Sequence, residues 1–322
     1  MLKQSLLALS LCTGLSQAAM AQAQWPNERV ITIVVASSAG GGTDTVARVL
    51  ANELAKPIGQ QFVVENRPGA GNVRGSDVVA KSAPDGYTLL MSASTLAINH
   101  VMYKQLPYDV ARDFAPITQM VSLPNVLVVG MGTPFRSFGD FLSAARAKPG
   151  ALTYGSAGLG TAPHMAMELL RVSANIDVLH VPYTGVAPAL NDIIGGRVDG
   201  MLVNFLSAKP QIDGGTLRAL AMSSASRSRF MPDLPTINES GVPGYEAIQW
   251  FGLLAPAGTP QAIIDRLQAE TAKILETPAM KARLALEGAE PIGNSPAEFS
   301  ALIKAEMAKW SQVAKAAGIK PE

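Results

Sequence analysis

Short apolar runs alternate with longer segments of mixed polarity along most of this chain. The runs have the length and composition of buried β-strands. They occupy residues 30–35, 62–64, 87–91, 125–129, 152–154, 178–181, 198–203 and 217–222. Clusters rich in glycine and proline, such as residues 67–71 and 84–86, separate the runs and indicate turns. Strands that alternate with helices predict an α/β architecture.

The C-terminal part of the chain shows the clearest helical pattern. Thr259 is expected to cap a helix that begins with Pro260, because apolar residues then recur on one face until Pro278 interrupts the pattern. Ser295 and Glu298 have the spacing of a capping box at the start of a second helix. The apolar stripe of that helix is expected to pack in the core.

The first residues have the pattern of a secretory signal. Lys3 precedes an apolar run at residues 6–15, and residues 19–21 form a small-x-small cleavage site. We expect cleavage after Ala21, so that residues 1–21 are the signal peptide and the mature protein is exported to the periplasm. The apolar run is too short to span a bilayer.

Composition excludes several classes of function. Cys12 is the only cysteine and lies in the signal segment, and the bulky Leu11 before it disfavours lipidation. The mature chain therefore has no disulfide and no thiolate metal site. The 26 basic and 25 acidic residues of the full chain are well mixed, which makes nucleic acid a poor candidate partner. About 300 mature residues exceed the usual size of one core, so two domains are expected.

Two glycine-rich loops carry the most specific signal. They lie at residues 40–44 and 156–161, each between a strand-like run and a helix-like run. The first N–H groups of a helix have no partner within the helix, and the helix dipole is positive at that end. Glycines allow a ligand to approach these groups closely. Together the loops predict a site for one small anion, for which a carboxylate is the simplest candidate.

Enzyme and cofactor chemistry has weaker support. Ser156 lies in a sequence close to the nucleophile elbow of serine hydrolases, but Tyr154 occupies the position of the first glycine. His164 could act as the base only if the loop folds back. The three histidines lack the spacing of metal ligands, and neither loop has the ending of a nucleotide-binding motif. We expect no cofactor and no metal, and a serine hydrolase remains an alternative.

Several short motifs follow one another along the mature chain. They are GGTD at 41–44, VENRPGAG at 64–71, PDGYTL at 84–89, SAG at 156–158, HVPYTG at 180–185, WFG at 250–252 and APAGTP at 255–260. In this order they resemble the motifs of the Bug-type periplasmic solute-binding proteins, the substrate-binding family of the tripartite tricarboxylate transporters. Each motif is weak alone, but the series covers almost the whole mature chain.

The resemblance implies a type II periplasmic-binding-protein fold, with two α/β lobes joined by two crossings and a ligand cleft between them. The crossings are expected near residues 123–126 and 245–250. Residues 22–124 are then the first part of lobe 1, residues 125–247 form lobe 2, and residues 248–322 return to lobe 1 and contribute the C-terminal helices.

The resemblance also implies that backbone amides and hydroxyls from both lobes hold one carboxylate, partly through water. Ser94, Gly185 and Asn204 are candidates for the far end of the ligand. The other expected ligand-binding residues are Ser37, Ser38, Gly40, Gly41, Gly42, Thr43, Asp44, Ser156, Gly158, Gly160, Thr161, His164 and Tyr183.

Four of these residues also have structural interpretations. Thr43 can cap its helix, and Asp44 can interact with the helix dipole. An anionic Asp44 would repel a carboxylate, so we expect its side chain to hold the loop or interlobe geometry, or a bridging water, while its N–H assists the ligand. His164 can donate to the anion or connect loop and helix. Tyr183 can line the cleft or lie half-buried beside a turn.

The chain departs from the family pattern at two places. Ala36 and Ser37 replace the usual proline and phenylalanine, and residues 72–74 read Asn-Val-Arg in place of Gly-Asn-Ile. Loss of an aromatic wall would enlarge the cleft, so we expect a larger or more polar ligand than the smallest amino-acid-like ones. Arg74 can pair with a second carboxylate or lie exposed in solvent.

The expected function is capture of a small organic carboxylate in the periplasm and its delivery to inner-membrane transporter subunits, with the lobes closing over the ligand. A receptor that presents the ligand to a periplasmic sensor domain, for example that of a sensor kinase, would use the same pocket. A monomer is expected, because a cleft between two lobes of one chain needs no second subunit. Backbone loops recognise a carboxylate without identifying the molecule that carries it.

Overall fold

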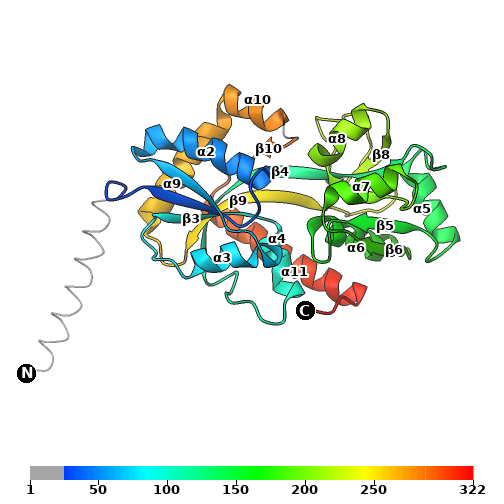
Figure 1. Cartoon of the computed structure of the whole chain (residues 1–322), viewed down its shortest axis with the longest axis horizontal. Coiled ribbons are helices and arrows are strands. Elements are labelled where there is room, and N and C mark those ends of the chain that lie inside the picture. The colour runs from blue at the N-terminus through cyan, green and yellow to red at the C-terminus, as the bar shows by residue number, and fades with distance from the viewer. Residues whose placement is uncertain (1–24, 287, 322) are drawn as a thin grey trace, which may run out of the picture.

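A computed structural model describes residues 25–286 and 288–321 of the chain. The predicted signal peptide, with its cleavage site after Ala21, lies outside the described residues. The described part is an elongated molecule with two lobes (Figure 1). Both lobes combine strands with helices, as the α/β prediction requires.

Lobe 1 combines the N-terminal and C-terminal segments of the described chain. Its strands are β1 (Ile31–Val35), β2 (Phe62–Asn66), β3 (Thr88–Ala93), the first part of β4 (Phe114–Gly130), β9 (Ile248–Pro256) and β10 (Glu290–Pro291). Its helices are α2 (Gly42–Ile58), η1 (Ala70–Asn72), α3 (Val73–Ala80), α4 (Thr95–Met102), α9 (Gln261–Glu276), α10 (Pro278–Leu286) and α11 (Pro296–Ala317).

The strands of lobe 1 follow the order β10-β4-β9-β3-β1-β2. β1 is parallel to both β2 and β3, whereas β9 is antiparallel to β3 and β4. The chain leaves β1 for β2 on one side and then crosses to β3 on the other side. Ligands of open α/β sheets bind outside the carboxyl ends of strands at such a reversal. Helices α2, α9 and α10 cover one face of the sheet, and α3, α4 and α11 cover the other (Figure 1).

Lobe 2 is built around the second part of β4. This part pairs in antiparallel fashion with β7 (Met201–Asn204) and β8 (Leu217–Met222). β5 (Thr153–Ser156) and β6 (Leu179–Pro182) form a parallel pair beside them. The helices of this lobe are α5 (Phe138–Ala147), α6 (Ala162–Ala174), α7 (Val186–Ile194) and α8 (Phe205–Asp213).

The change of lobe occurs along β4. This strand pairs with β9 as far as Pro124 and with β7 from Asn125 onward. At this point the Asn125 side chain donates to the Ala247 carbonyl at 2.6 Å and accepts from Gln249 Nε2 at 2.9 Å. This geometry supports the expected domain boundaries after residues 124 and 247, which stay predictions.

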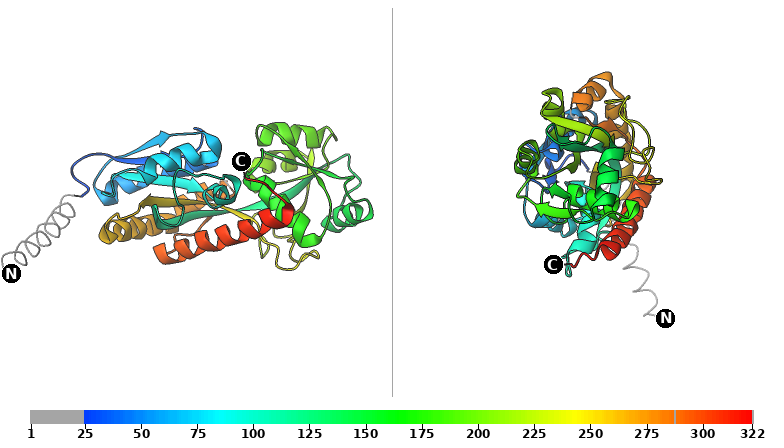
Figure 2. Two further views of the ribbon diagram at one scale, coloured as in Figure 1. Left: turned by 90° about the horizontal axis from the view of Figure 1, so that it is seen from below. Right: turned by 90° about the vertical axis from the view of Figure 1, so that its right-hand side faces the viewer.

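Helix α11 lies against both lobes (Figure 2). It begins with the predicted capping box, in which Ser295 Oγ accepts from the Glu298 N–H and the Glu298 carboxylate accepts from the Ser295 N–H. The apolar stripe, including the buried Trp310, belongs to a cluster that extends from α4 in lobe 1 to α6 in lobe 2. Arg171 of α6 also donates to the Ala317 carbonyl at 3.1 Å.

One local prediction is wrong and another is incomplete. Thr259 does not cap α9, because its hydroxyl donates to the Pro256 carbonyl at 2.8 Å and the helix begins at Gln261. The strand expected at residues 125–129 is the end of a strand of 17 residues. The first part of this strand was not predicted, because buried polar residues such as Gln119 interrupt the apolar pattern.

Candidate functional site

Elements of both lobes meet at the carboxyl ends of the lobe 1 strands. Residues 36–41 follow β1, η1 follows β2, and Ser94 connects β3 to α4. In lobe 2, residues 157–161 connect β5 to α6. A Cβ placed on Gly160 would lie 2.9 Å from Cγ of Met102 in α4. The second glycine-rich loop therefore touches lobe 1 at the end of α4.

The first loop is held by the buried Asp44, which is 3% exposed. Its Oδ2 accepts from the Gly40 N–H at 2.8 Å and from Arg48 Nε at 3.0 Å, and its Oδ1 accepts from Asn66 Nδ2 at 3.0 Å. Burial raises the pKa of this carboxyl, but hydrogen bonds from Arg48, Gly40 and Asn66 outweigh it and lower the pKa below its usual value. The loop-holding role expected for Asp44 is confirmed.

Helix α2 begins directly after this loop. Its N-cap is Gly41 and no side chain caps it, so the capping role predicted for Thr43 is wrong: Thr43 lies within the first turn. The N–H groups of Gly42, Thr43 and Asp44 have no carbonyl partner within the helix. A Cβ on Gly42 would lie 3.3 Å from the ring of Phe251 in β9. Glycine at this position thus lets the start of α2 approach the strand.

The second loop is fixed by Ser156. Its Oγ lies 2.6 Å from His180 Nε2 and accepts from the Gly158 N–H at 3.1 Å. Thr161 Oγ1 donates to the Gly158 carbonyl at 2.7 Å. Gly158 has a φ of +125°, a conformation that glycine adopts readily. Because Ser156 is fully buried, its hydroxyl holds the loop in shape.

Three stacked rings lie beneath the second loop. The ring centroid of His180 is 4.8 Å from that of Tyr154 and 4.3 Å from that of His164. His164 Nδ1 accepts from the Gly160 N–H at 3.2 Å and so connects the loop to α6, which is one of the two roles expected for it. Burial and then the neighbouring His180 lower the pKa of His164 to about 4, and burial also lowers the pKa of His180. Both imidazoles are therefore neutral at pH 7.

Glu168 supports this stack from α6. Its carboxylate accepts from Tyr154 Oη at 2.5 Å and from Arg171 at 2.8 Å. Burial, followed by the charge of Glu168, raises the pKa of the Tyr154 hydroxyl. The ion pair and the hydroxyl join β5 to α6, the two elements that flank the loop.

These internal bonds change which backbone donors remain for a ligand. The N–H groups of Gly40, Gly158 and Gly160 are engaged within their own lobes. The donors without helical partners are those in the first turns of α2 and α6, at residues 42–44, 162 and 164, since Pro163 has no N–H. The backbone donors that lack an internal partner thus lie at the two helix N-termini, directly after the glycine-rich loops.

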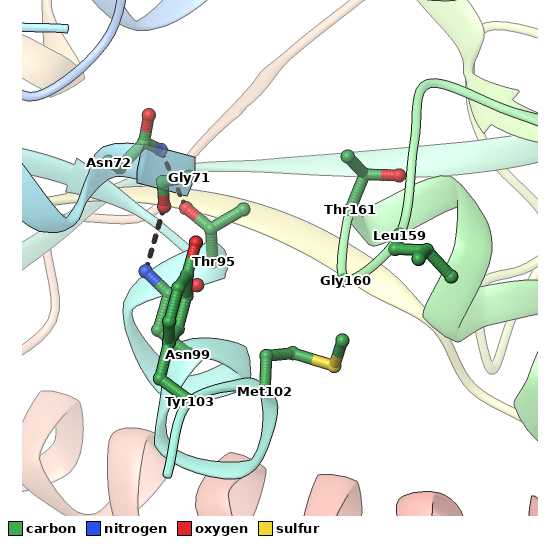
Figure 3. A pocket seen from close by; sticks show the side chains of 9 residues that line it. All are labelled: Gly71, Asn72, Thr95, Asn99, Met102, Tyr103, Leu159, Gly160 and Thr161. Carbon is green, nitrogen blue, oxygen red and sulfur yellow. Dashed lines mark hydrogen bonds between the residues drawn. The ribbon is translucent and has the colours of Figure 1, made fainter. Parts of the chain in front are cut away.

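A cavity of about 230 Å³ lies between the lobes beside the second loop (Figure 3). One wall comes from η1 and α4, and the other comes from the loop before α6 (Figure 3). The lining residues are Gly71, Asn72, Thr95, Asn99, Met102, Tyr103, Leu159, Gly160 and Thr161. Of the expected ligand-binding residues, only Gly160 and Thr161 are among them.

The lobe 1 wall of the cavity was missed in the sequence. Thr95, Asn99 and Tyr103 recur at intervals of four residues, so they share one face of α4 and its end. A polar face on an otherwise apolar short helix is a signal that could have found them. Asn72 was noticed only as a departure from the family pattern.

Other expected site residues lie away from the cavity. The N–H of the buried Ser94 donates to the Trp250 carbonyl at 3.0 Å. Ser37 Oγ is buried and has no hydrogen-bond partner among the described residues, whereas Ser38 is exposed. Arg74 is exposed, as one of its two interpretations expected. Ligand contact by these serines stays a prediction.

Three expected residues of lobe 2 have local partners. Tyr183 Oη donates to Asp192 Oδ2 at 2.6 Å. Asn204 caps α8 by accepting from the Ser207 N–H at 2.8 Å, and Gly185 is the N-cap of α7. None of the three lines the cavity, so their contact with a ligand stays a prediction.

The geometry corrects the pairing considered for catalysis. Ser156 contacts His180, and His164 instead binds the Gly160 N–H. Within residues 25–286 and 288–321, no three His, Cys, Asp or Glu side chains gather so as to hold a metal ion. None of the described helices combines the length and apolar character needed to cross a bilayer.

The chain is similar to known proteins in both sequence and structure. The model of the tripartite tricarboxylate transporter family receptor matches residues 46–319. BugT of Bordetella pertussis is 36% identical over 294 residues, which cover 91% of this chain and 90% of BugT. The structure of R. palustris Rpa4515 with adipate has a TM-score of 0.82 at 39% identity and covers 92% of this chain and 100% of that chain. The structure of MatC from Rhodopseudomonas palustris with bound malate has a TM-score of 0.76 at 32% identity. It covers 89% of this chain and 99% of that chain.

The two-lobed periplasmic-binding-protein fold expected from the motifs is confirmed by these structures. The family and its structural neighbours are periplasmic solute-binding proteins and not enzymes, so the serine hydrolase alternative is set aside. The chain belongs to the tripartite tricarboxylate transporter receptor family and is a Bug-type periplasmic solute-binding protein.

Proposed function

We propose that this chain binds one small organic carboxylate between its lobes in the periplasm and delivers it to the membrane subunits of a tripartite tricarboxylate transporter. The carboxylate lies between the first turns of α2 and α6, where backbone N–H groups lack helical partners. Thr43 contributes a hydroxyl within the first turn of α2. The protein acts as a monomer. Residues 22–124 and 248–322 form its lobe 1, and residues 125–247 form its lobe 2.

The observation that carries this proposal is the pair of helix N-termini in different lobes, each preceded by a glycine-rich loop. Both loops are fixed by buried polar networks, one around Asp44 and one around Ser156 and His164. Pre-organised donors lose little entropy when a ligand binds. The adipate and malate bound to the related structures support a carboxylate as the ligand class.

A substitution at the start of α2 tests the carboxylate site. Gly41 is exposed, has a φ of −78° and would tolerate a Cβ, so Gly41→Leu fills space before α2 without backbone strain. A panel of organic acids is titrated by calorimetry and thermal shift, starting from protein that begins at residue 22. A bound acid at a hundredfold excess over its Kd stabilises the fold by about 2.7 kcal/mol. Gly41→Leu should weaken binding at least tenfold.

Gly132→Leu is the matched control, because Gly132 is also exposed, lacks a positive φ and has no atom near its would-be Cβ. Wild-type affinity in Gly41→Leu, or no stabilisation by any acid of the panel, would contradict the carboxylate site. Delivery is tested by uptake of the radiolabelled acid in cells with and without this chain. Unchanged uptake without the chain would contradict the transporter role.

A further inference from the structure

The cavity between the lobes is lined without a single charged side chain. Its nine lining residues are glycines, hydroxyl and amide residues, a tyrosine and two apolar residues. The two apolar residues, Met102 and Leu159, come from opposite walls (Figure 3). Leu159 is 57% exposed and stands at the tip of the second loop. The cavity therefore combines neutral hydrogen-bonding groups with an apolar side.

The amide groups of the lobe 1 wall are fixed by hydrogen bonds. Asn72 Nδ2 donates to Thr95 Oγ1 at 2.7 Å, and Asn99 Nδ2 donates to the Gly71 carbonyl at 2.7 Å (Figure 3). The Asn72 amide keeps a second N–H and its oxygen, the Asn99 amide keeps its oxygen, and the Thr95 hydroxyl keeps its proton. The wall thus offers both donors and acceptors, which suits a ligand group that is itself both a donor and an acceptor.

The basic side chains nearby do not reach this lining. Arg74 follows Asn72 by two residues, but it is exposed, and its guanidinium carbon lies 3.4 Å from the would-be Cβ of Gly69. His100 and Lys104 lie on α4 and just beyond it, and both line a separate surface hollow around residues 103–112. None of the three lines the interlobe cavity.

We propose that the ligand of this chain carries one carboxylate and an uncharged polar far end, a hydroxyl or a primary amide, which lies in this cavity. This inference rests on the proposed carboxylate site. The helix N-termini neutralise the one carboxylate, while the far end exchanges hydrogen bonds with the Asn72, Thr95 and Asn99 wall. The cavity of about 230 Å³ is large enough to hold such a small polar group.

A second carboxylate is disfavoured by its loss of water. A carboxylate that enters a site without a counter-charge loses hydration that neutral hydrogen bonds restore only in part. A hydroxyl or amide of similar shape loses less hydration free energy, and it can form hydrogen bonds with both the donors and the acceptors of the wall. The chain is therefore expected to differ in preference from the relatives whose structures hold the dicarboxylates adipate and malate.

Matched acid pairs test the far end directly. Succinate, glutarate and adipate are each compared by calorimetry with the monoamide of the same length, and with the ω-hydroxy acid, at pH 8 and constant salt. At the length that binds most tightly, the monoamide or hydroxy acid should bind at least tenfold more tightly than the dicarboxylate. Equal or tighter dicarboxylate binding would overturn this inference and leave the carboxylate site intact. Absence of binding by every acid would overturn both.

A charge added at the cavity rim provides the second readout. Leu159→Lys places an ammonium beside the lining, and should shift the dicarboxylate-to-monoamide preference at least fivefold toward the dicarboxylate. Leu286→Lys is the matched control, because Leu286 is 71% exposed and lies at the end of α10, outside the cavity. An unchanged preference in Leu159→Lys, or an equal shift in both variants, would overturn the assignment of the far end to this cavity.

Discussion

Buried polar side chains hold both loops of the site in place. Asp44 binds the Gly40 N–H in lobe 1, and His164 binds the Gly160 N–H in lobe 2. Asp44 acts as a charged group whose pKa is lowered by its donors, whereas His164 acts as a neutral group whose pKa is lowered mainly by burial. Each residue thus serves the ligand by fixing the backbone beside it.

The lowered pKa of His164 makes stability depend on pH. Its pKa is about 4 in the folded protein against the usual 6.5, so the unfolded state binds more protons between these values. The contribution of neutral His164 to the free energy of unfolding is complete above pH 6.5, and it is lost as the pH falls toward 4. Urea unfolding should show a loss on the order of 3 kcal/mol over this range.

His164→Gln should flatten this part of the pH profile, since glutamine retains an acceptor for the Gly160 N–H but binds no proton. The control is His100→Gln, because His100 lies exposed on α4. A profile that stays equally steep in His164→Gln would show that another group causes the acid loss.

At the level of elements, capping and burial decide where helices begin and what they join. α11 starts at a complete capping box, and a second box, Ser137 with Asp140, starts α5. The box at Ser295 was predicted from its spacing, whereas that at Ser137 was missed although its Ser-x-x-Asp spacing is similar. α11 then extends along both lobes (Figure 2), so its stability affects the whole molecule.

Removal of the α11 cap should be measurable. Ser295→Ala leaves the Glu298 N–H without its side-chain acceptor and should lower the free energy of unfolding by about 1 kcal/mol in urea titrations. Ser311→Ala is the control in the same helix. The Ser311 hydroxyl only donates back to the Met307 carbonyl, and alanine favours the helix, so stability should stay within about 0.5 kcal/mol. Equal losses in both variants would contradict the capping role.

The whole molecule depends on how closely its lobes approach. Gly160 of lobe 2 meets Met102 of lobe 1, and its φ of +68° adds a second need for glycine. The lobes are also connected by β4, which continues from one lobe into the other, and by the apolar cluster that α11 shares with both lobes. Closure is therefore expected to act on the side of the two glycine-rich loops.

Gly160→Ala should hold the lobes apart, because its Cβ would overlap Met102 Cγ at 2.9 Å. Affinity for the cognate acid should fall at least tenfold, and small-angle scattering should show a smaller compaction on ligand addition. Gly215→Ala is the control, since Gly215 has a φ of +67° but open space around it. Both variants should lose similar stability from backbone strain, about 1 kcal/mol. Wild-type affinity in Gly160→Ala would contradict this account of closure.

Much of the architecture was visible in local patterns. The runs at residues 30–35 and 217–222 became β1 and β8, the Ser295 box started α11, and the glycine-rich loops preceded α2 and α6. These features depend on neighbouring residues alone, namely alternation, capping spacing and glycine content. The family motifs added the two-lobed fold, which no single pattern contains.

Tertiary structure decided the partners of the buried polar groups. Ser156 contacts His180, 24 residues away in sequence, and not His164. The polar wall of Thr95 and Asn99 faces a cavity only because lobe 2 lies opposite it. The sequence alone thus determined most of the strands, the start of α11 and the glycine-rich loops before α2 and α6, because these are properties of short segments. Only the folded chain determined which backbone donors lack an internal partner and which neutral groups line the cavity, because those depend on contacts between distant segments.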